Sequence, residues 1–219
     1  ARSYILYREE RAKKRGKTKK KTIELDKEVN ISVTKKNGET VPLDVARLSS
    51  IITDACEGLD DVEPKAVLEE SIGNLYDGVS VDDMRASLIM TSRTKVEKEP
   101  NYSFVTARIL MDQIRNEALE FLGIAEDATY RDMQEYYPKA LESYIDKGIE
   151  LDILNPELKT FDLKKIGQAI DYTRDNQFTY LGLQTLYDRY FIHSDDTTYE
   201  LPQILSLIHI SEPTRPLYI

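Results

Sequence analysis

Apolar and polar residues alternate in two short segments near the start of the chain. Ile31 and Val33 are separated by one polar residue, and Val41 and Leu43 are likewise two positions apart. A period of two predicts strands, because successive side chains of a strand point to opposite faces. We therefore expect two short strands, each with one buried face.

The residues between and within these segments predict how the strands pair. Asn37 and Gly38 suit a tight turn in which both residues have positive φ, so the sequence predicts a β-hairpin. Pro42 has no N–H to donate, which confines the second strand to a sheet edge or makes it very short.

After the hairpin, apolar residues recur at every third or fourth position, the spacing of amphipathic helices. Asp44 can cap the first helix, and Pro64 suits the first turn of the second. Ser80 and Asp83 resemble a capping box for a third helix, and a long fourth helix follows Pro100. The sequence thus predicts a hairpin capped by four helices.

From Asp127 onward the pattern is helical almost throughout. Pro138 should kink or split the first of these helices. Asn155 and Pro156 mark the start of a short helix, Asp162 can cap another, and residues 178–191 are expected to form the last. The predicted fold class is mainly α.

Composition describes a globular chain with 41% hydrophobic and 32% charged residues. The net charge of -9 argues against a general binder of nucleic acid or anionic membranes. No apolar stretch approaches the length of a membrane span, and no signal peptide is recognisable. A single cysteine, Cys56, excludes a disulfide framework and fits a reducing compartment, so we expect a cytoplasmic protein.

Residues 1–22 hold ten Lys or Arg against two Glu, so the rest of the chain is strongly acidic. The run Lys13–Lys21 could be a nucleic-acid-binding arm or a solvated linker. The linker interpretation is favoured, because the run lacks interleaved aromatic residues and joins an acidic body.

Two stretches resemble a known family. "ISVTKKNGETVPLDVARLSSIITDACEGL", followed by "LYDGVSVDDM" and "PNYSFVTARIL", resembles the ATP-cone, a nucleotide-sensing module at the N-terminus of ribonucleotide reductases. "FDLKKIGQAIDYTRDNQFTYLGLQTLYDRYF", followed by "YELPQ", resembles the all-helical N-terminal domain of the class I ribonucleotide reductase large subunit. The stretches cover residues 30–118 and about 128–203 and occur in the family's order.

The resemblance implies an ATP-cone at residues 29–124 and an all-α domain at 125–204. Residues 1–15 look like the last helix of a truncated upstream cone, because some large subunits of the family carry two cones in tandem, and 16–28 would be the basic linker. Residues 205–219 lack the preceding helical pattern and resemble a translated sequencing adapter. We expect that tail to be poorly ordered.

As function, the resemblance implies the N-terminal regulatory part of a ribonucleoside-diphosphate reductase large subunit. Its effectors would be ATP and dATP, and the intact enzyme would be a homo-oligomer with a small radical-generating subunit. One alternative is a non-catalytic nucleotide-binding module, such as a cone-bearing repressor, but that needs a four-cysteine zinc ribbon. Another is the cone of a class II or III reductase, which "LYDRYF" disfavours.

No catalytic residue or metal ligand is expected in this part of the chain. Reductases of the family use several cysteines, whereas Cys56 stands alone and is expected to be a buried structural thiol. His193 and His209 do not indicate a metal site.

The expected nucleotide contacts surround the hairpin and the start of the first helix. Cations beside a turn with free N–H groups can neutralise phosphate, although ordinary surface cations near a hairpin would look the same. By resemblance the nucleotide-contact positions are Lys35, Lys36, Val41, Pro42, Leu43, Asp44, Val45, Ala46 and Arg47.

Three positions depart from the family's pattern. Val41 replaces a Glu on the second strand, Val81 replaces a Thr, and Asn116 stands where a phosphate-binding Lys is expected. Losing a cation and two polar contacts should cost several kcal/mol of binding free energy. We therefore expect a weakened cone, or one that acts as a spacer.

Overall fold

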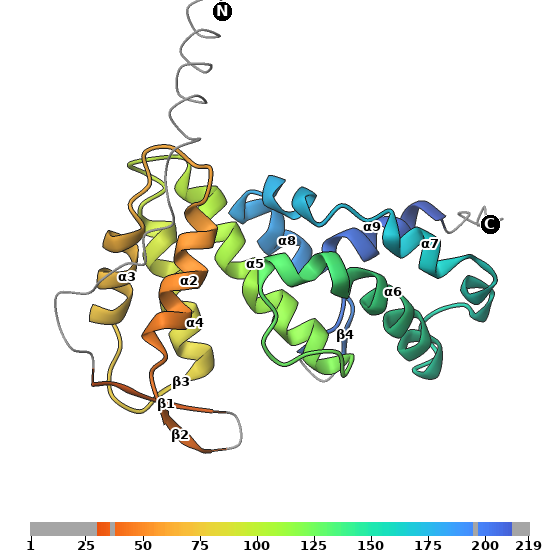
Figure 1. The fold of residues 1–219 in the computed structure, drawn as a ribbon, viewed down its shortest axis with the longest axis horizontal. Helices are drawn as coiled ribbons and strands as arrows, with labels where there is room; N and C mark the ends of the chain where they lie inside the picture. The colour runs from red at the N-terminus through yellow and green to blue at the C-terminus, as the bar shows by residue number, and fades with distance from the viewer. Residues whose placement is uncertain (1–29, 36–37, 195–196, 212–219) are drawn as a thin grey trace, which may run out of the picture.

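The structure is a computed structural model that describes residues 30–35, 38–194 and 197–211 (Figure 1). The expected upstream helix, the basic linker and Lys36 lie outside the described residues. The first half comprises β1 (Ser32–Thr34), β2 (Thr40–Pro42), α2 (Val45–Cys56), α3 (Pro64–Gly73), β3 (Val79–Ser80), α4 (Val81–Thr94) and α5 (Tyr102–Phe121). The second comprises η1 (Tyr130–Asp132), α6 (Met133–Glu150), η2 (Pro156–Thr160), α7 (Leu163–Gln168), η3 (Tyr172–Gln177), α8 (Tyr180–Arg189), β4 (His193–Ser194), β5 (Thr197–Thr198) and α9 (Pro202–Ser211).

The predicted hairpin is confirmed. β1 and β2 pair antiparallel with Val33 opposite Val41, and Gly38 has the positive φ of 82° that its turn requires. β2 lies at the sheet edge and contains three residues, as Pro42 led us to expect.

A third strand escaped the sequence reasoning. β3 pairs parallel with β1, placing Val79 opposite Val33. Two residues are too few to show a period, and Ser80 was recognised only as a helix cap. β3 fixes the start of α4 directly beside the hairpin.

The four predicted helices of the first half are confirmed, and α2 and α4 begin at the predicted caps. The Asp44 carboxylate accepts a hydrogen bond of 2.8 Å from the Arg47 N–H, and the Ser80 hydroxyl accepts one of 3.0 Å from the Asp83 N–H. α3 begins at Pro64. The mainly α fold class is likewise confirmed.

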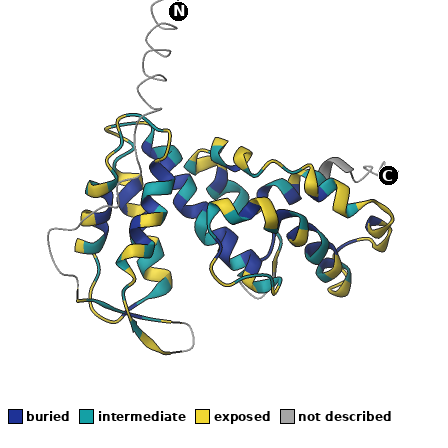
Figure 2. Ribbon diagram, viewed as in Figure 1, coloured by how far each residue is buried: buried dark blue, intermediate teal, exposed yellow. Residues whose placement is uncertain are grey.

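The long helix α5 holds the two halves together. It packs against α2 and α4 on one side and against α8, η3 and β5 on the other. Figure 2 shows α5 as a mostly dark blue ribbon, because twelve of its twenty residues are buried. The hydrophobic core is thus continuous from the first half into the second.

In the second half, Pro138 does not split its helix. α6 runs from Met133 to Glu150 with Pro138 inside it, so the helix continues past the one backbone hydrogen bond that a proline cannot donate. The short helix at Pro156 and the cap at Asp162, which accepts a 3.1 Å bond from the Lys165 N–H, are confirmed.

The expectation that residues 205–219 are poorly ordered needs correction for residues 205–211. The last helix in the described residues is not α8 but α9, which continues to Ser211. Leu205 and Ile208 are only 7% and 8% exposed and join the core, because they follow the buried Leu201 and Ile204 at helical spacing. Residues 212–219 lie outside the description.

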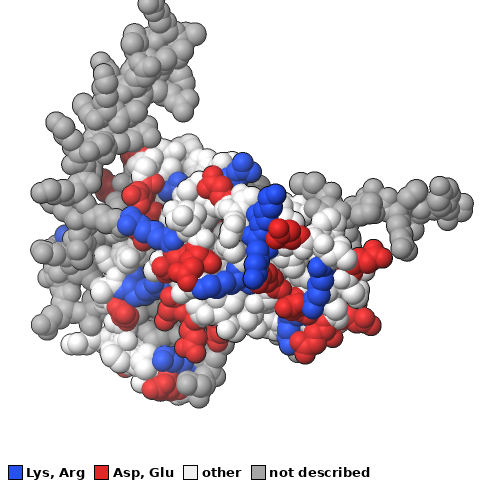
Figure 3. Space-filling view, turned by 45° about the vertical axis from the view of Figure 1, so that its right-hand side comes forward, with Lys and Arg blue, Asp and Glu red and all other residues white. Residues whose placement is uncertain are grey.

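Charges of both signs are interspersed over the face seen in Figure 3. Within the described residues, no helix is long and apolar enough to span a membrane.

Candidate functional site

A cavity of about 230 Å³ lies between the hairpin, the start of α2, and the helices α4 and α5. Six of the nine predicted contact residues line it: Lys35, Val41, Pro42, Leu43, Asp44 and Arg47. Val45 and Ala46 belong to the first turn of α2 but do not line the cavity. The sequence therefore located a real concave site, and the assignment of nucleotide contacts within it stays a prediction.

One wall of the cavity is apolar, and the sequence reasoning did not anticipate its extent. α4 contributes Val81, Met84 and Leu88, which share one face of the helix. Further apolar side chains come from other elements: Val33, Val41, Leu43, Leu48, Ile51 and Ile109. Such a wall can cover the faces of a planar aromatic base.

Three described cations line the same cavity: Lys35, Arg47 and Arg85. Lys35 is exposed and pairs with Glu39 at 3.8 Å, an arrangement that adds little stability. Arg85 was missed by the sequence reasoning. Its position four residues after Val81 places it on the same face of α4, which is the signal that could have found it.

A largely buried carboxylate, Asp112 of α5, lies among the arginines. Its side chain is 14% exposed and pairs with Arg115 at 3.4 Å. Burial raises the pKa of Asp112, and the charges of Arg115, Arg47 and Arg85 oppose that rise. Asp112 thus interacts electrostatically with three arginines near the cavity.

Asn116 occupies the position at which the resemblance implied a phosphate-binding Lys. It is 2% exposed, and its Oδ1 accepts a 2.8 Å hydrogen bond from the N–H of Ala128. Its Nδ2 donates to the carbonyl of Asp112 at 2.8 Å. Asn116 therefore fastens the segment after α5, a use for this position that sequence reasoning could not foresee.

Arg47 faces that same segment from α2. Its Nη2 donates to the Ala128 carbonyl at 3.5 Å and pairs with Asp127 Oδ1 at 3.8 Å. The side chain of Arg47 is 26% exposed, whereas that of Asp127 is 82% exposed.

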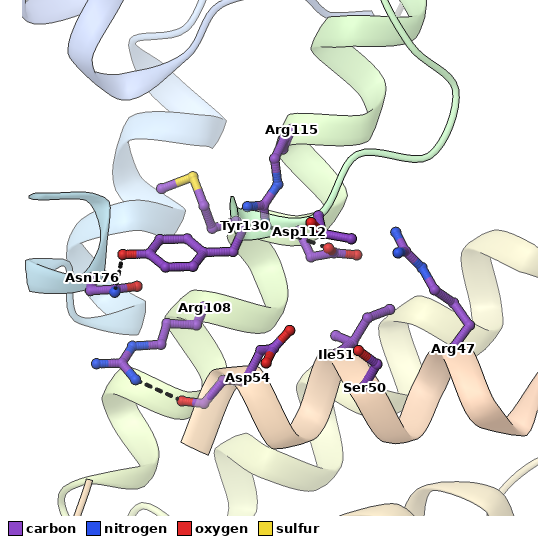
Figure 4. A pocket seen from close by; sticks show the side chains of 12 residues that line it. Arg47, Ser50, Ile51, Asp54, Arg108, Asp112, Arg115, Tyr130 and Asn176 are labelled. Atoms are coloured by element: carbon purple, nitrogen blue, oxygen red, sulfur yellow. Dashed lines mark hydrogen bonds and ion pairs between the residues drawn. The ribbon is translucent and has the colours of Figure 1, made fainter. Parts of the chain in front are cut away.

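Beyond Arg47 lies a second, smaller cavity of about 30 Å³ (Figure 4). It shares Arg47, Ile51 and Asp112 with the first cavity and extends to Tyr130 and Asn176 of the second half. Its volume matches a single water molecule and is too small for a nucleotide. Because residues of both halves line it, it marks the junction between them.

Arg108 ties this junction to the end of α2. Its Nη1 donates to the carbonyls of Ala55 and Glu57 at 3.0 and 2.7 Å. Nearby, the Asn176 amide donates to the Tyr130 hydroxyl at 2.6 Å. Arg108 thus holds the end of α2 against α5, and the second hydrogen bond joins η1 to η3 beside the same small cavity.

Cys56 is buried at the end of α2, as predicted, and burial raises the pKa of its thiol to about 12. A thiol with such a pKa is unreactive near neutral pH. Among the described residues there is no group of three or more His, Cys, Asp or Glu side chains that could hold a metal ion.

Comparison with known proteins agrees with this geometry. Residues 31–117 match the ATP cone domain family. The chain is 37% identical over 208 residues to the ribonucleoside-diphosphate reductase subunit alpha of Chlamydia muridarum, covering 93% of this chain and 19% of that protein. It is 32% identical over 175 residues to the subunit alpha of Helicobacter pylori strain 26695, covering 79% and 21%.

A more distant relative is ribonucleoside-diphosphate reductase 1 subunit alpha of Escherichia coli K12, 24% identical over 186 residues, with 82% of this chain and 23% of the relative covered. The chain thus spans about a fifth of the length of the curated relatives it matches.

Proposed function

Because residues 31–117 form an ATP cone domain and the chain is homologous to the N-terminal region of ribonucleoside-diphosphate reductase alpha subunits, we propose that it is the regulatory N-terminal part of such a subunit. The cavity between the hairpin, α2, α4 and α5 would be its effector site. The observation that carries the proposal is the combination, in one cavity, of an apolar wall with Lys35, Arg47 and Arg85.

The chemistry of the cavity suits a nucleotide with several phosphates, and the match to the ATP cone domain makes ATP and dATP the candidates. The wall formed by Val81, Met84 and Leu88 offers apolar surface to a base, and the cations offer charge-assisted hydrogen bonds to phosphate. Asp112 and Asp127 also line the cavity, and their charges oppose phosphate binding. ATP or dATP would therefore bind weakly for a cone, as the departures at Val41, Val81 and Asn116 also suggest.

In the intact protein, we propose reduction of ribonucleoside diphosphates for deoxyribonucleotide synthesis. The catalytic residues would belong to parts of the intact subunit outside this chain. That subunit would form a homo-oligomer, bind a small radical-generating partner subunit, and act in the cytoplasm. A purely non-catalytic regulatory module is not favoured, because three relatives that match most of this chain are all named as reductase alpha subunits.

Titration of the ¹⁵N-labelled chain with ATP and with dATP tests the effector site. Saturable shifts of the backbone amides of Lys35, Arg47 and Arg85 would support it, and Arg85→Met should weaken the affinity. Shifts confined to other parts of the chain, or none with either nucleotide, would overturn the proposal.

A further inference from the structure

Arg47 lies between the candidate effector cavity and the segment that leads from α5 into the second half. It lines both cavities, and Figure 4 shows its side chain reaching from α2 toward Asp112 of α5. One nitrogen, Nη2, faces both the Ala128 carbonyl and the Asp127 carboxylate. A change in the orientation of this guanidinium would therefore alter its contacts with residues 127–128.

Residues 127–128 are the point at which the second half begins. The buried Ala128 N–H is fixed to Asn116 of α5, whereas its carbonyl faces Arg47 of α2. The next residue, Thr129, forms a capping box with Asp132 that starts η1 and, directly after it, α6. Ala128 is thus held on both sides by residues that line the cavity.

The contacts of Arg47 with this segment are long. At 3.5 and 3.8 Å, and with Asp127 largely exposed, they contribute little to stability. A phosphate group offers shorter, charge-assisted hydrogen bonds to the same guanidinium. Asp127 itself lines the cavity, so its carboxylate opposes a phosphate there. Phosphate and segment therefore compete for one side chain.

We propose that Arg47 is a coupling residue: a triphosphate in the cavity draws its guanidinium away from Asp127 and Ala128, and so loosens the start of the second half. This inference rests on the proposed effector site. Because coupling between two sites is reciprocal, the contact with Asp127 must in turn weaken nucleotide binding. The coupling is negative, and that sign can be measured.

The test uses the whole chain, ATP as the probe, and fixed ionic strength. Asp127→Asn should tighten ATP binding about threefold to fivefold, the range expected when one exposed ion pair no longer competes. Glu126→Gln is the matched control, because it makes the same change of charge one residue away, outside the residues that line the cavity. It should change the affinity by much less.

Removing the Asp127 charge also reduces direct repulsion of phosphate, so the substitution is repeated with Arg47→Met. If the effect acts through Arg47, Asp127→Asn should leave the affinity of the Arg47→Met variant unchanged. If Asp127→Asn raised the ATP affinity equally in the wild-type chain and in the Arg47→Met variant, the inference would be overturned. The effect of Asp127 would then be direct electrostatic repulsion of the phosphates.

The Ala128 amide gives a second measurement by hydrogen exchange. Saturating ATP should raise its exchange rate in the wild-type chain, and by less in Asp127→Asn. This readout decides the question if Arg47→Met binds ATP too weakly to titrate, since a slower or unchanged exchange would overturn the inference. Absence of ATP binding to the wild-type chain would overturn the proposed function itself, and this inference with it.

Discussion

The hydroxyl of Tyr137 donates a hydrogen bond of 2.7 Å to Oδ2 of the buried Asp175, joining α6 to η3. Oδ1 of the same carboxylate accepts a bond of 2.9 Å from Gln203 of α9. Three elements of the second half thus meet on one carboxylate. Tyr137→Phe should lower the free energy of unfolding by about 1–3 kcal/mol, because a buried acceptor loses a partner.

Urea denaturation would measure that loss, with Tyr136→Phe as the matched control, since Tyr136 is the half-buried neighbour on the same helix. Equal effects of the two substitutions would contradict a special role for the Tyr137 hydroxyl.

The stability of the protein should depend on pH through the same carboxylate, that of Asp175. Burial raises the pKa of Asp175 above its ordinary value of 3.8, although the hydrogen bonds from Tyr137 and Gln203 oppose the rise. The folded state then binds more protons than the unfolded state, so the contribution of Asp175 to stability falls as the pH rises from about 4 through the raised pKa. Asp175→Asn should remove that fall.

Unfolding free energies of the wild type and Asp175→Asn, measured from pH 4 to 8, test this sign. The unfolding free energy of the wild type, relative to that of the variant, should fall as the pH rises. A difference that stays constant over the range would show that the folded-state pKa of Asp175 is not raised.

The capping residue of α4 should be worth about 1 kcal/mol. Ser80→Ala removes the acceptor for the Asp83 N–H and should lower the unfolding free energy by that amount. Ser87→Ala, at an interior position of the same helix, is the control and should be close to neutral. Similar losses for both would argue against the cap.

The continuation of α9 gives a prediction opposite to the one made from sequence. Because Leu205 and Ile208 are buried in the core, removal of residues 205–219 should lower the melting temperature by several degrees. Removal of 212–219 alone is the matched control and should have a much smaller effect. An unchanged melting temperature for the longer deletion would restore the expectation that this tail is foreign to the fold.

The affinity for nucleotide should be low. With Val41, Val81 and Asn116 in place of two polar groups and a cation, we expect binding weaker by roughly a hundredfold than in a cone that keeps them, which corresponds to about 2.8 kcal/mol. Calorimetric titration of the chain with dATP measures this. Micromolar or tighter binding that Lys35→Ala abolishes would show an effective sensor instead.

No ribonucleotide reduction is expected from this chain, even with a small subunit added. Cys56 is the single cysteine, it is buried, and its raised thiol pKa leaves it unreactive. An assay with ribonucleoside diphosphates and a thiol reductant should show no deoxyribonucleotide, and turnover would contradict the assignment of chemistry to other parts of the intact protein.

Sequence reasoning succeeded where the signal was local. Asp44, Pro64 and Ser80 marked helix starts correctly, because capping depends on neighbouring backbone groups. It failed where contacts join distant segments. β3 is too short to show a period, and the bond from Ala128 to Asn116 spans a turn that no pattern reveals.

The candidate site divides in the same way. The hairpin and the start of α2 were placed correctly from a continuous motif, whereas Arg85, Asp112 and the apolar wall of α4 and α5 come to the cavity through tertiary packing. Asn116 was recognised as a departure, yet its use as an anchor for Ala128 depends on where the chain turns after α5.

The shared helix α5 has a consequence for how the chain unfolds. Its two sides are buried by opposite halves of the molecule, so neither half can lose its structure without exposing a face of the same helix. The described chain should therefore melt as one cooperative unit, with coincident transitions for probes in both halves. A cut near residue 124 would expose the apolar face of α5 that the second half covers, and the resulting fragment should aggregate. The boundary that the sequence indicates is therefore a poor place to divide the protein.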